Sequence, residues 1–218
     1  YHRRDDGFLG IYDSEGFETG SAGDQILQGL HEVVTSRQRG PIDQQIHAAW
    51  YLVRWSDRRF EDAQAAFVRG LADLGLPVIV VITQVPTRDG QVHPHATELA
   101  DYITGLDLPI RAGSRPVLTN ALGDSFTDAP VFGLQELLDA TYDVAPEAAE
   151  AALTAAQRLD MERKKKAVKA IINQAVTVAS GIGAVPIPFT DAALLVPNQV
   201  TMISRISAAY GLPPRRSR

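Results

Sequence analysis

The chain has 218 residues, of which 45% are hydrophobic and 22% charged, proportions that are ordinary for a soluble globular protein. This length suits one α/β domain with a smaller attachment. Cysteine is absent, which excludes disulfides and cysteine-ligated zinc and fits a reducing compartment, so we expect a cytoplasmic protein. The first residues, including Arg3 and Asp5, are too polar for a signal peptide.

Charge is distributed unevenly along the chain. Residues 1–157 hold 11 basic and 23 acidic side chains, a net charge of −12, whereas residues 158–218 hold 10 basic and 3 acidic ones, a net charge of +7. We therefore expect the two parts to meet different partners. The acidic character of the larger part argues against a nucleic-acid-binding protein.

The first predicted element is an apolar run, Phe8–Tyr12, that leads to Asp13 and, three residues later, to Gly16. We interpret the run as a buried strand that fixes the direction of the Asp13 carboxylate. Such a carboxylate could hold the water shell of Mg²⁺, which prefers oxygen ligands. The backbone N–H of Gly16 could approach a terminal phosphate, because no side chain shields it. An ordinary Asp-Ser-Glu-Gly turn is the alternative.

Strands and helices then alternate, with short turns between them. The spacing of apolar residues predicts helices over Asp24–Thr35, Phe60–Leu74, Pro94–Leu106 and Phe132–Tyr142, and strands over Ile46–Trp55, Gly75–Thr83 and Arg115–Asn120. The continuous Val and Ile run within Gly75–Thr83 is typical of a parallel strand covered on both faces. This order predicts a doubly wound α/β sheet in residues 1–145, with ligands at the carboxyl ends of its strands.

Aromatic and histidine residues in this part have mainly structural interpretations. Trp50, Tyr51 and Trp55 are expected to fill the core around their strand. Ser56 or Asp57 is the predicted cap of the next helix. His93 and His95 form a close pair, which a flexible polar turn explains better than a metal site.

From Pro146 onward the composition changes, and residues 146–218 are predicted to form an all-α domain. A basic cluster, Arg163, Lys164, Lys165, Lys166 and Lys169, reads either as a solvated helix face or as a binding site for anionic lipid. Two apolar stretches, Ala167–Val185 and Asp191–Ile206, are interrupted by polar residues, so neither is a convincing membrane span. A soluble helical hairpin is predicted, with membrane contact or insertion as the alternative.

Several separated segments resemble parts of one known architecture. FLGIYDSEGFE, IHAAWYLVRWSDRRFE, LPVIVVITQ and VLTNA, in that order, resemble the second half of an Era-like GTPase domain. The tail, above all VPIPFTDA, PNQVTMISRI and AAYG, is similar to a helical domain of unknown function found behind such GTPase domains in many bacterial proteins. The resemblance covers most of residues 7–212. It implies a partial P-loop NTPase-type sheet, followed by the helical domain.

The resemblance also implies GTP or GDP with Mg²⁺ as ligands. It places Asp13 at the magnesium-linked acid, Gly16 at the γ-phosphate-sensing glycine, Thr83 and Gln84 in the guanine-recognition motif, and Asn120 and Ala121 in the loop that touches the base. Two residues depart from the pattern, because Gln84 replaces a lysine and Pro86 stands where an aspartate accepts the guanine N–H groups. Guanine and adenine therefore stay open as alternatives, unless Asp89 supplies the missing carboxylate.

A G-x-x-x-x-G-K-[ST] phosphate loop does not occur in these 218 residues. In a GTPase this loop lies upstream of the Asp13 segment and holds the β- and γ-phosphates. We expect that the protein extends upstream of Tyr1; a relic that binds no nucleotide is the alternative. As it stands, the chain should bind nucleotide weakly or not at all.

The predicted function is a GTPase switch in which residues 14–23 respond to the nucleotide. Glu15 and Glu18 lie near the site, but no catalytic residue is assigned. The tail, residues 146–218, would carry the signal to an anionic membrane surface, peripheral to the inner membrane, or to a protein partner. The alternative is a membrane- or partner-binding module on a degenerate GTPase scaffold that works without nucleotide.

Overall fold

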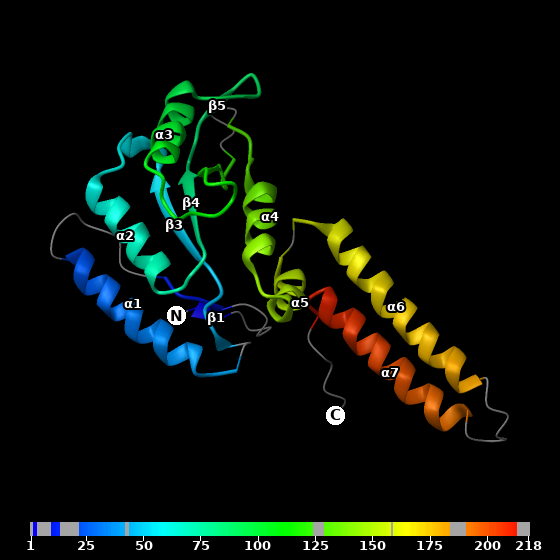
Figure 1. Ribbon diagram of the computed structural model, residues 1–218. Helices are drawn as coiled ribbons and strands as arrows, with labels where there is room; N and C mark the ends of the chain where they lie inside the picture. The colour runs from blue at the N-terminus through cyan, green and yellow to red at the C-terminus, as the bar shows by residue number, and fades with distance from the viewer. Residues whose placement is uncertain are drawn as a thin grey trace. The chain divides into compact units, whose positions relative to one another are not determined.

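The structure is a computed structural model that describes residues 2–3, 10–13, 22–41, 44–123, 129–157, 159–183 and 191–212 (Figure 1). The chain divides into two compact units. One, here called the α/β unit, is Ser14–Ala149; the other, the helical unit, combines Glu150–Arg218 with Tyr1–Asp13. The division at Ala149 lies close to the boundary that the sequence predicts after residue 145.

The α/β unit is built on a parallel sheet. Its described strands are β3 (Ala49–Arg54), β4 (Val78–Thr83) and β7 (Val117–Leu118), in the order β3-β4-β7. β4 pairs with β3 along its whole length and with β7 at Val81 and Ile82. The residues Val78 to Ile82 are all buried, which confirms the prediction of a central strand covered on both faces.

Helices cover both faces of this sheet. On one face, α2 (Asp62–Asp73) and α3 (Pro94–Gly105) form the main core with β3 and β4, and α1 (Ala22–Gln38) packs against α2 (Figure 1). The main core contains Tyr51, Val53, Phe60, Phe67, Val68, Leu71, Val80, Ile82, Leu99 and Ile103. On the other face, α4 (Leu134–Val144) places Leu137 and Ala140 against Ile79, Val81 and Val117. The mixed α/β architecture is therefore confirmed.

Two local predictions were wrong, and a third segment has more structure than expected. Trp50 is 49% exposed, because α4 packs over β4 and β7 and meets Trp50 at the edge of the helix, where the indole N–H donates to Thr141 Oγ1. α2 begins after Glu61, whose side chain and that of Gln64 form a capping box, while Asp57 ends a short 3₁₀ turn, η2 (Trp55–Asp57). The predicted polar turn contains a hairpin of β5 (Thr87–Arg88) and β6 (Gln91–Val92).

The apolar run before Asp13 also differs from its prediction. Gly10–Ile11 forms β2, which pairs antiparallel with β1 (His2–Arg3) and does not join the β3-β4-β7 sheet. Ile11 is 53% exposed, so the described part of this run is not a buried strand. Phe8 lies outside the described residues.

The helical unit contains most of α5 (Glu147–Ala156), together with α6 (Met161–Gly183) and α7 (Asp191–Ala209). α6 and α7 pack side by side as a hairpin (Figure 1). Near its base, the buried Lys164 donates from Nζ to the carbonyl oxygen of Ala155 at 3.0 Å. Among the described helices, none has both the length and the apolar composition needed to cross a membrane.

Candidate functional site

The carboxyl ends of β4 and β7 meet at one edge of the sheet. The backbone N–H of Val85, just after β4, donates to the carbonyl oxygen of Thr119 at 3.1 Å, and Thr119 N–H donates to Ile82 O at 2.8 Å. The Thr83 hydroxyl donates to Val53 O of β3 at 3.4 Å. The segments that hold Thr83 and Asn120, far apart in the sequence, therefore lie next to each other, as the predicted site requires.

Gln84 occupies an unusual backbone conformation at this edge. Its φ angle is +58°, in the left-handed region that non-glycine residues rarely adopt. The next residue, Val85, is buried and hydrogen-bonded to Thr119, so it holds the chain in place while the Gln84 side chain is exposed. Strained backbone of this kind is often found at functional sites.

Asn120 has a structural part in its loop. Its Nδ2 donates to Pro130 O at 2.9 Å, and its backbone N–H and C=O both bond to Phe132 at 3.0 Å. The residue is buried, whereas the adjacent Ala121 is exposed. Because the Asn120 backbone N–H is already bonded to Phe132, Ala121 is the better placed of the two for a ligand.

An aromatic and histidine cluster lies beyond the end of β3. The ring centroids of Trp55 and His93 are 4.5 Å apart, those of His93 and His95 are 5.0 Å apart, and the Arg58 guanidinium lies 5.0 Å from the Trp55 ring. His93 caps α3, since its Nδ1 accepts the backbone N–H of His95 at 3.2 Å. Sequence reasoning missed this cluster because Trp55 and His93 are distant in the chain. The one local signal was a polar residue before Pro94, typical of a helix start.

Metal-binding residues do not gather in the described ranges: no group of three or more histidine, aspartate or glutamate side chains there could hold an ion. Asp13 is exposed and follows β2 in the helical unit. Gly16 lies outside the described residues. Their roles at Mg²⁺ and at the γ-phosphate stay predictions.

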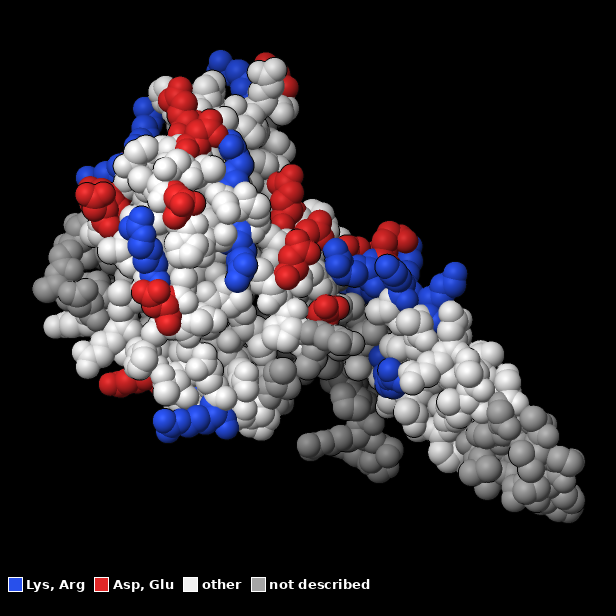
Figure 2. All heavy atoms as spheres, viewed as in Figure 1, with Lys and Arg blue, Asp and Glu red and all other residues white. Residues whose placement is uncertain are grey.

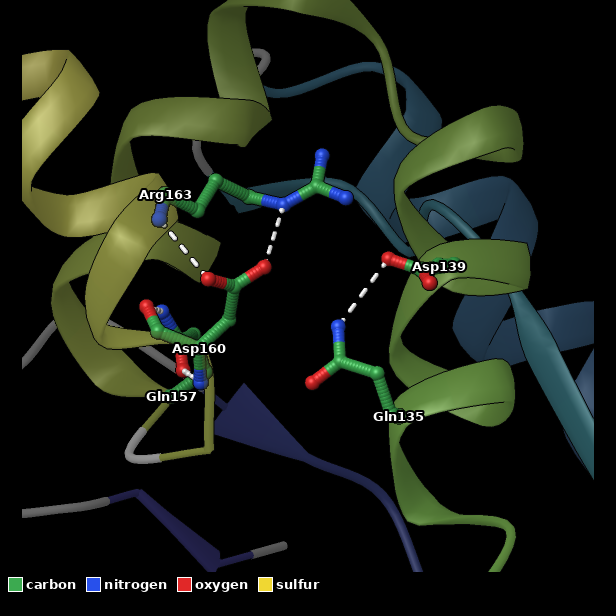
Figure 3. A network of polar contacts seen from close by, with 5 residues as sticks. All are labelled: Gln135, Asp139, Gln157, Asp160 and Arg163. Carbon is green, nitrogen blue, oxygen red and sulfur yellow. Dashed lines mark hydrogen bonds and ion pairs between the residues drawn. The ribbon is translucent and has the colours of Figure 1, made fainter.

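The residues of the tail's basic cluster differ in burial and in their contacts, although they are close together in the sequence. Arg163 donates from Nε to Asp160 Oδ2 at 3.2 Å, and Asp160 caps α6 by accepting the backbone N–H of Arg163 at 2.7 Å (Figure 3). Lys164 points inward and is buried. Lys165 lies 2.5 Å from Glu162, and this hydrogen bond and charge raise the pKa of Lys165 above its ordinary value. Lys166 and Lys169 are exposed.

Gln157 completes the polar arrangement at the start of α6. Its Nε2 donates to Asp160 O and its Oε1 accepts the Asp160 backbone N–H, both at 2.8 Å. On α4, also drawn in Figure 3, Gln135 Nε2 donates to Asp139 Oδ1 at 3.2 Å. Because Arg163 and Lys164 make these local contacts, Lys165, Lys166 and Lys169 are the members of the cluster that remain exposed.

No protein family's sequence profile matches this chain, and neither the curated proteins nor the solved structures include a significant match to it.

Proposed function

We propose that the α/β unit is part of a GTP-binding domain of the P-loop NTPase type. The observation that carries the proposal is the hydrogen bond from Val85 N–H to Thr119 O, which brings the loops of Thr83 and Asn120 together at the carboxyl edge of a parallel sheet. Open α/β sheets bind their ligands at this edge. The exposed side chain of Gln84 and the exposed Ala121 are then the groups nearest to a bound base.

The exposed flank of β3 leaves room for a further strand and helix. Trp50 is 49% and Leu52 59% exposed on the face that α4 covers elsewhere. Parallel strands are normally covered on both faces. In this proposal, a further strand and helix pack here and bring a phosphate-binding loop, which these 218 residues lack.

The residues fit the nucleotide unequally. Asp13 follows β2 in the helical unit, so its role at Mg²⁺ rests only on the resemblance and on its exposed carboxylate. Hydrolysis would be phosphoryl transfer to water, accelerated by positioning and charge stabilisation. Gln84 and Pro86 do not fit guanine recognition, because neither offers a carboxylate. Asp89, exposed in the β5–β6 turn, is the remaining candidate to accept the guanine N–H groups.

Calorimetry tests the proposal on the full-length protein as it is encoded, here called the extended protein. We expect binding of GTP and GDP in the presence of Mg²⁺, and sharply lower GTP hydrolysis after Asp13→Ala, with Asp73→Ala, an exposed carboxylate at the end of α2, as the matched control. Titration with ATP decides the base preference, and Asp89→Asn should abolish any preference for GTP. An extended protein that binds no nucleotide would refute the assignment.

A second candidate is a binding module that uses its helical tail without nucleotide. The departures at Gln84 and Pro86 favour it, as does the basic tail with its exposed Lys166 and Lys169. An anionic membrane surface is the partner that this charge suits best. Sedimentation of the chain with anionic vesicles at low salt, without nucleotide, tests it; a chain that stays in solution contradicts the lipid contact.

A further inference from the structure

The far part of the α6–α7 hairpin is apolar on its outside. Half-buried positions mark the seam between the two helices: Ile171, Ala175 and Ala179 on α6, and Leu195, Asn198 and Met202 on α7. A helical hairpin in water normally turns polar side chains outward from such a seam. Here the outward Val176 is 56% and Val200 59% exposed, and Val178 and Val196 are exposed as well.

Charged residues are scarce in this part of the hairpin. Between Ala170 and Ser204 the sequence contains one charged residue, Asp191. Exposed basic residues stand on either side of this stretch: Lys165, Lys166 and Lys169 before it, and Arg205 after it. Figure 2 shows the separation, with charged side chains gathered near the beginning of α6 and an uncharged surface on the described part beyond. A solvated helix pair would carry charges along its whole length.

Several of the polar side chains in the far part bond within the hairpin. The hydroxyls of Thr177 and Ser180 donate to backbone oxygens one turn earlier, at 3.0 and 2.9 Å. Asn198 Nδ2 donates across the seam to Ala175 O at 3.0 Å. Arg205 donates to Gln174 Oε1 at 2.7 Å, which marks the last charged contact before the apolar part. In hydrocarbon, polar groups need internal partners of this kind.

We propose that the hairpin beyond the Gln174–Arg205 contact inserts into one leaflet of an anionic bilayer. From Gln174 to the end of α6 at Gly183, at 1.5 Å per residue, the helix extends about 14 Å, about half of a hydrocarbon core of roughly 30 Å. The hairpin therefore enters the bilayer without crossing it. The lysines that precede Gln174 lie at headgroup depth, with their stems along the apolar boundary.

This inference deepens the membrane-binding role proposed for the tail, and it does not depend on nucleotide. All its experiments are done on the full chain without nucleotide. Failure of nucleotide binding would leave it intact, and failure of insertion would leave the proposed nucleotide site intact.

A fluorescent label tests the depth of insertion. Because the chain has no cysteine, Val178→Cys gives a single site for an environment-sensitive dye, and Leu122→Cys, on an exposed residue of the α/β unit, is the matched control. With phosphatidylglycerol–phosphatidylcholine vesicles whose acyl chains are brominated, we expect a blue shift and quenching at position 178 and neither at position 122. Equal signals from the two sites would overturn insertion.

Charge substitution tests the same surface by vesicle flotation. The double substitution Val176→Glu and Val200→Glu places charges at outward positions and should lower vesicle binding at least about tenfold, because charges are expelled from hydrocarbon. Leu122→Glu with Val131→Glu, two exposed apolar residues of the α/β unit, should leave it unchanged. Circular dichroism confirms that both proteins keep their helices. If the hairpin double mutant binds vesicles as well as the unsubstituted chain, the proposal is wrong.

The basic residues before Gln174 account for lipid selectivity. Substitution of Lys165, Lys166 and Lys169 by Gln should weaken binding to anionic vesicles roughly fivefold for each residue and reduce its salt dependence. Light scattering of the unsubstituted chain without lipid tests the main alternative, in which a second copy of the chain covers the apolar surface. Self-association that Val176→Glu abolishes, without vesicle binding, would show that a second copy covers the apolar surface and would overturn the proposal.

Discussion

Replacing Gly133 by alanine should destabilise the α/β unit through a clash with β7. Gly133 precedes α4 with a φ angle of +75°, and a Cβ atom there would lie 1.9 Å from Leu118 O and 2.9 Å from the Leu118 carbonyl carbon. Both are backbone atoms of β7, so the strand or the helix must shift. We expect about 1–2 kcal/mol for the left-handed conformation and about 1–3 kcal/mol for the displacement, a large part of the total stability of a domain, about 5–15 kcal/mol.

Tryptophan fluorescence during urea unfolding measures this loss. Both tryptophans, Trp50 and Trp55, lie in the α/β unit, and Trp50 Nε1 donates to Thr141 Oγ1 of α4 at 3.2 Å, so its emission also reports a shift of that helix. The midpoint should fall by about 1–2 M urea. Gly113→Ala is the control, since its φ is +69° but its Cβ would meet nothing within 4 Å. Equal midpoints for the two variants would refute the clash.

Three further predictions concern single side chains. Asp160→Ala removes the cap of α6 and should lower the free energy of unfolding by about 1 kcal/mol, measured by chemical unfolding followed by circular dichroism. Asp160→Asn should retain most of the cap. Equal stability of the two variants would contradict the capping role. Burial raises the pKa of Tyr51 above its ordinary value of 10.0, and a hydrogen bond with Gln64 partly offsets this rise. The unfolded chain therefore loses the Tyr51 proton at a lower pH than the folded chain does. As a result, the stability of the folded chain falls as the pH rises above about 10. Tyr51→Phe should reduce that fall relative to Tyr102→Phe, an exposed control, when urea midpoints are compared at pH 8 and pH 11. Gln84→Gly and Ser114→Gly both relieve left-handed backbone at exposed residues and should change stability by less than about 1 kcal/mol, but only Gln84→Gly should alter nucleotide affinity in the extended protein.

Among the predicted strands, β4 is the one that the sequence predicts best. The Val and Ile run of β4 is buried throughout, because such a run leaves no face that water could cover. Trp50 shows where the same reasoning fails. Trp50 and Tyr51 are neighbours in β3, so their side chains lie on opposite faces of the sheet, as the sequence predicts. The sequence does not say whether a helix covers each of these faces. Tyr51 lies under α2, near Phe67, while Trp50 lies at the edge of α4, bonded to Thr141, and stays half exposed.

Features that depend on contacts between residues far apart in the chain could not be predicted from the sequence. The left-handed Gln84 is held by buried Val85 and its bond to Thr119, more than thirty residues away, so no local propensity predicts it. The same is true of the tilted contact between the Trp55 and His93 rings. The inward turn of Lys164 was also missed, since five basic residues close together in a sequence read as one surface, whereas the helix divides them among several directions.

The two proposals rest on different chemistry, and their tests separate four outcomes. A switch that signals through a membrane requires both nucleotide binding at the edge beside Gln84 and insertion of the hairpin beyond Gln174. Nucleotide binding without insertion would redirect the tail toward a protein partner. Insertion without nucleotide binding would favour the degenerate scaffold, and the left-handed strain at Gln84 would then need another explanation, because nothing in its own sequence favours that conformation. If both fail, the open flank of β3, with Trp50 and Leu52 exposed, remains the feature to explain, since a parallel strand left half-covered marks a surface that some other chain segment covers.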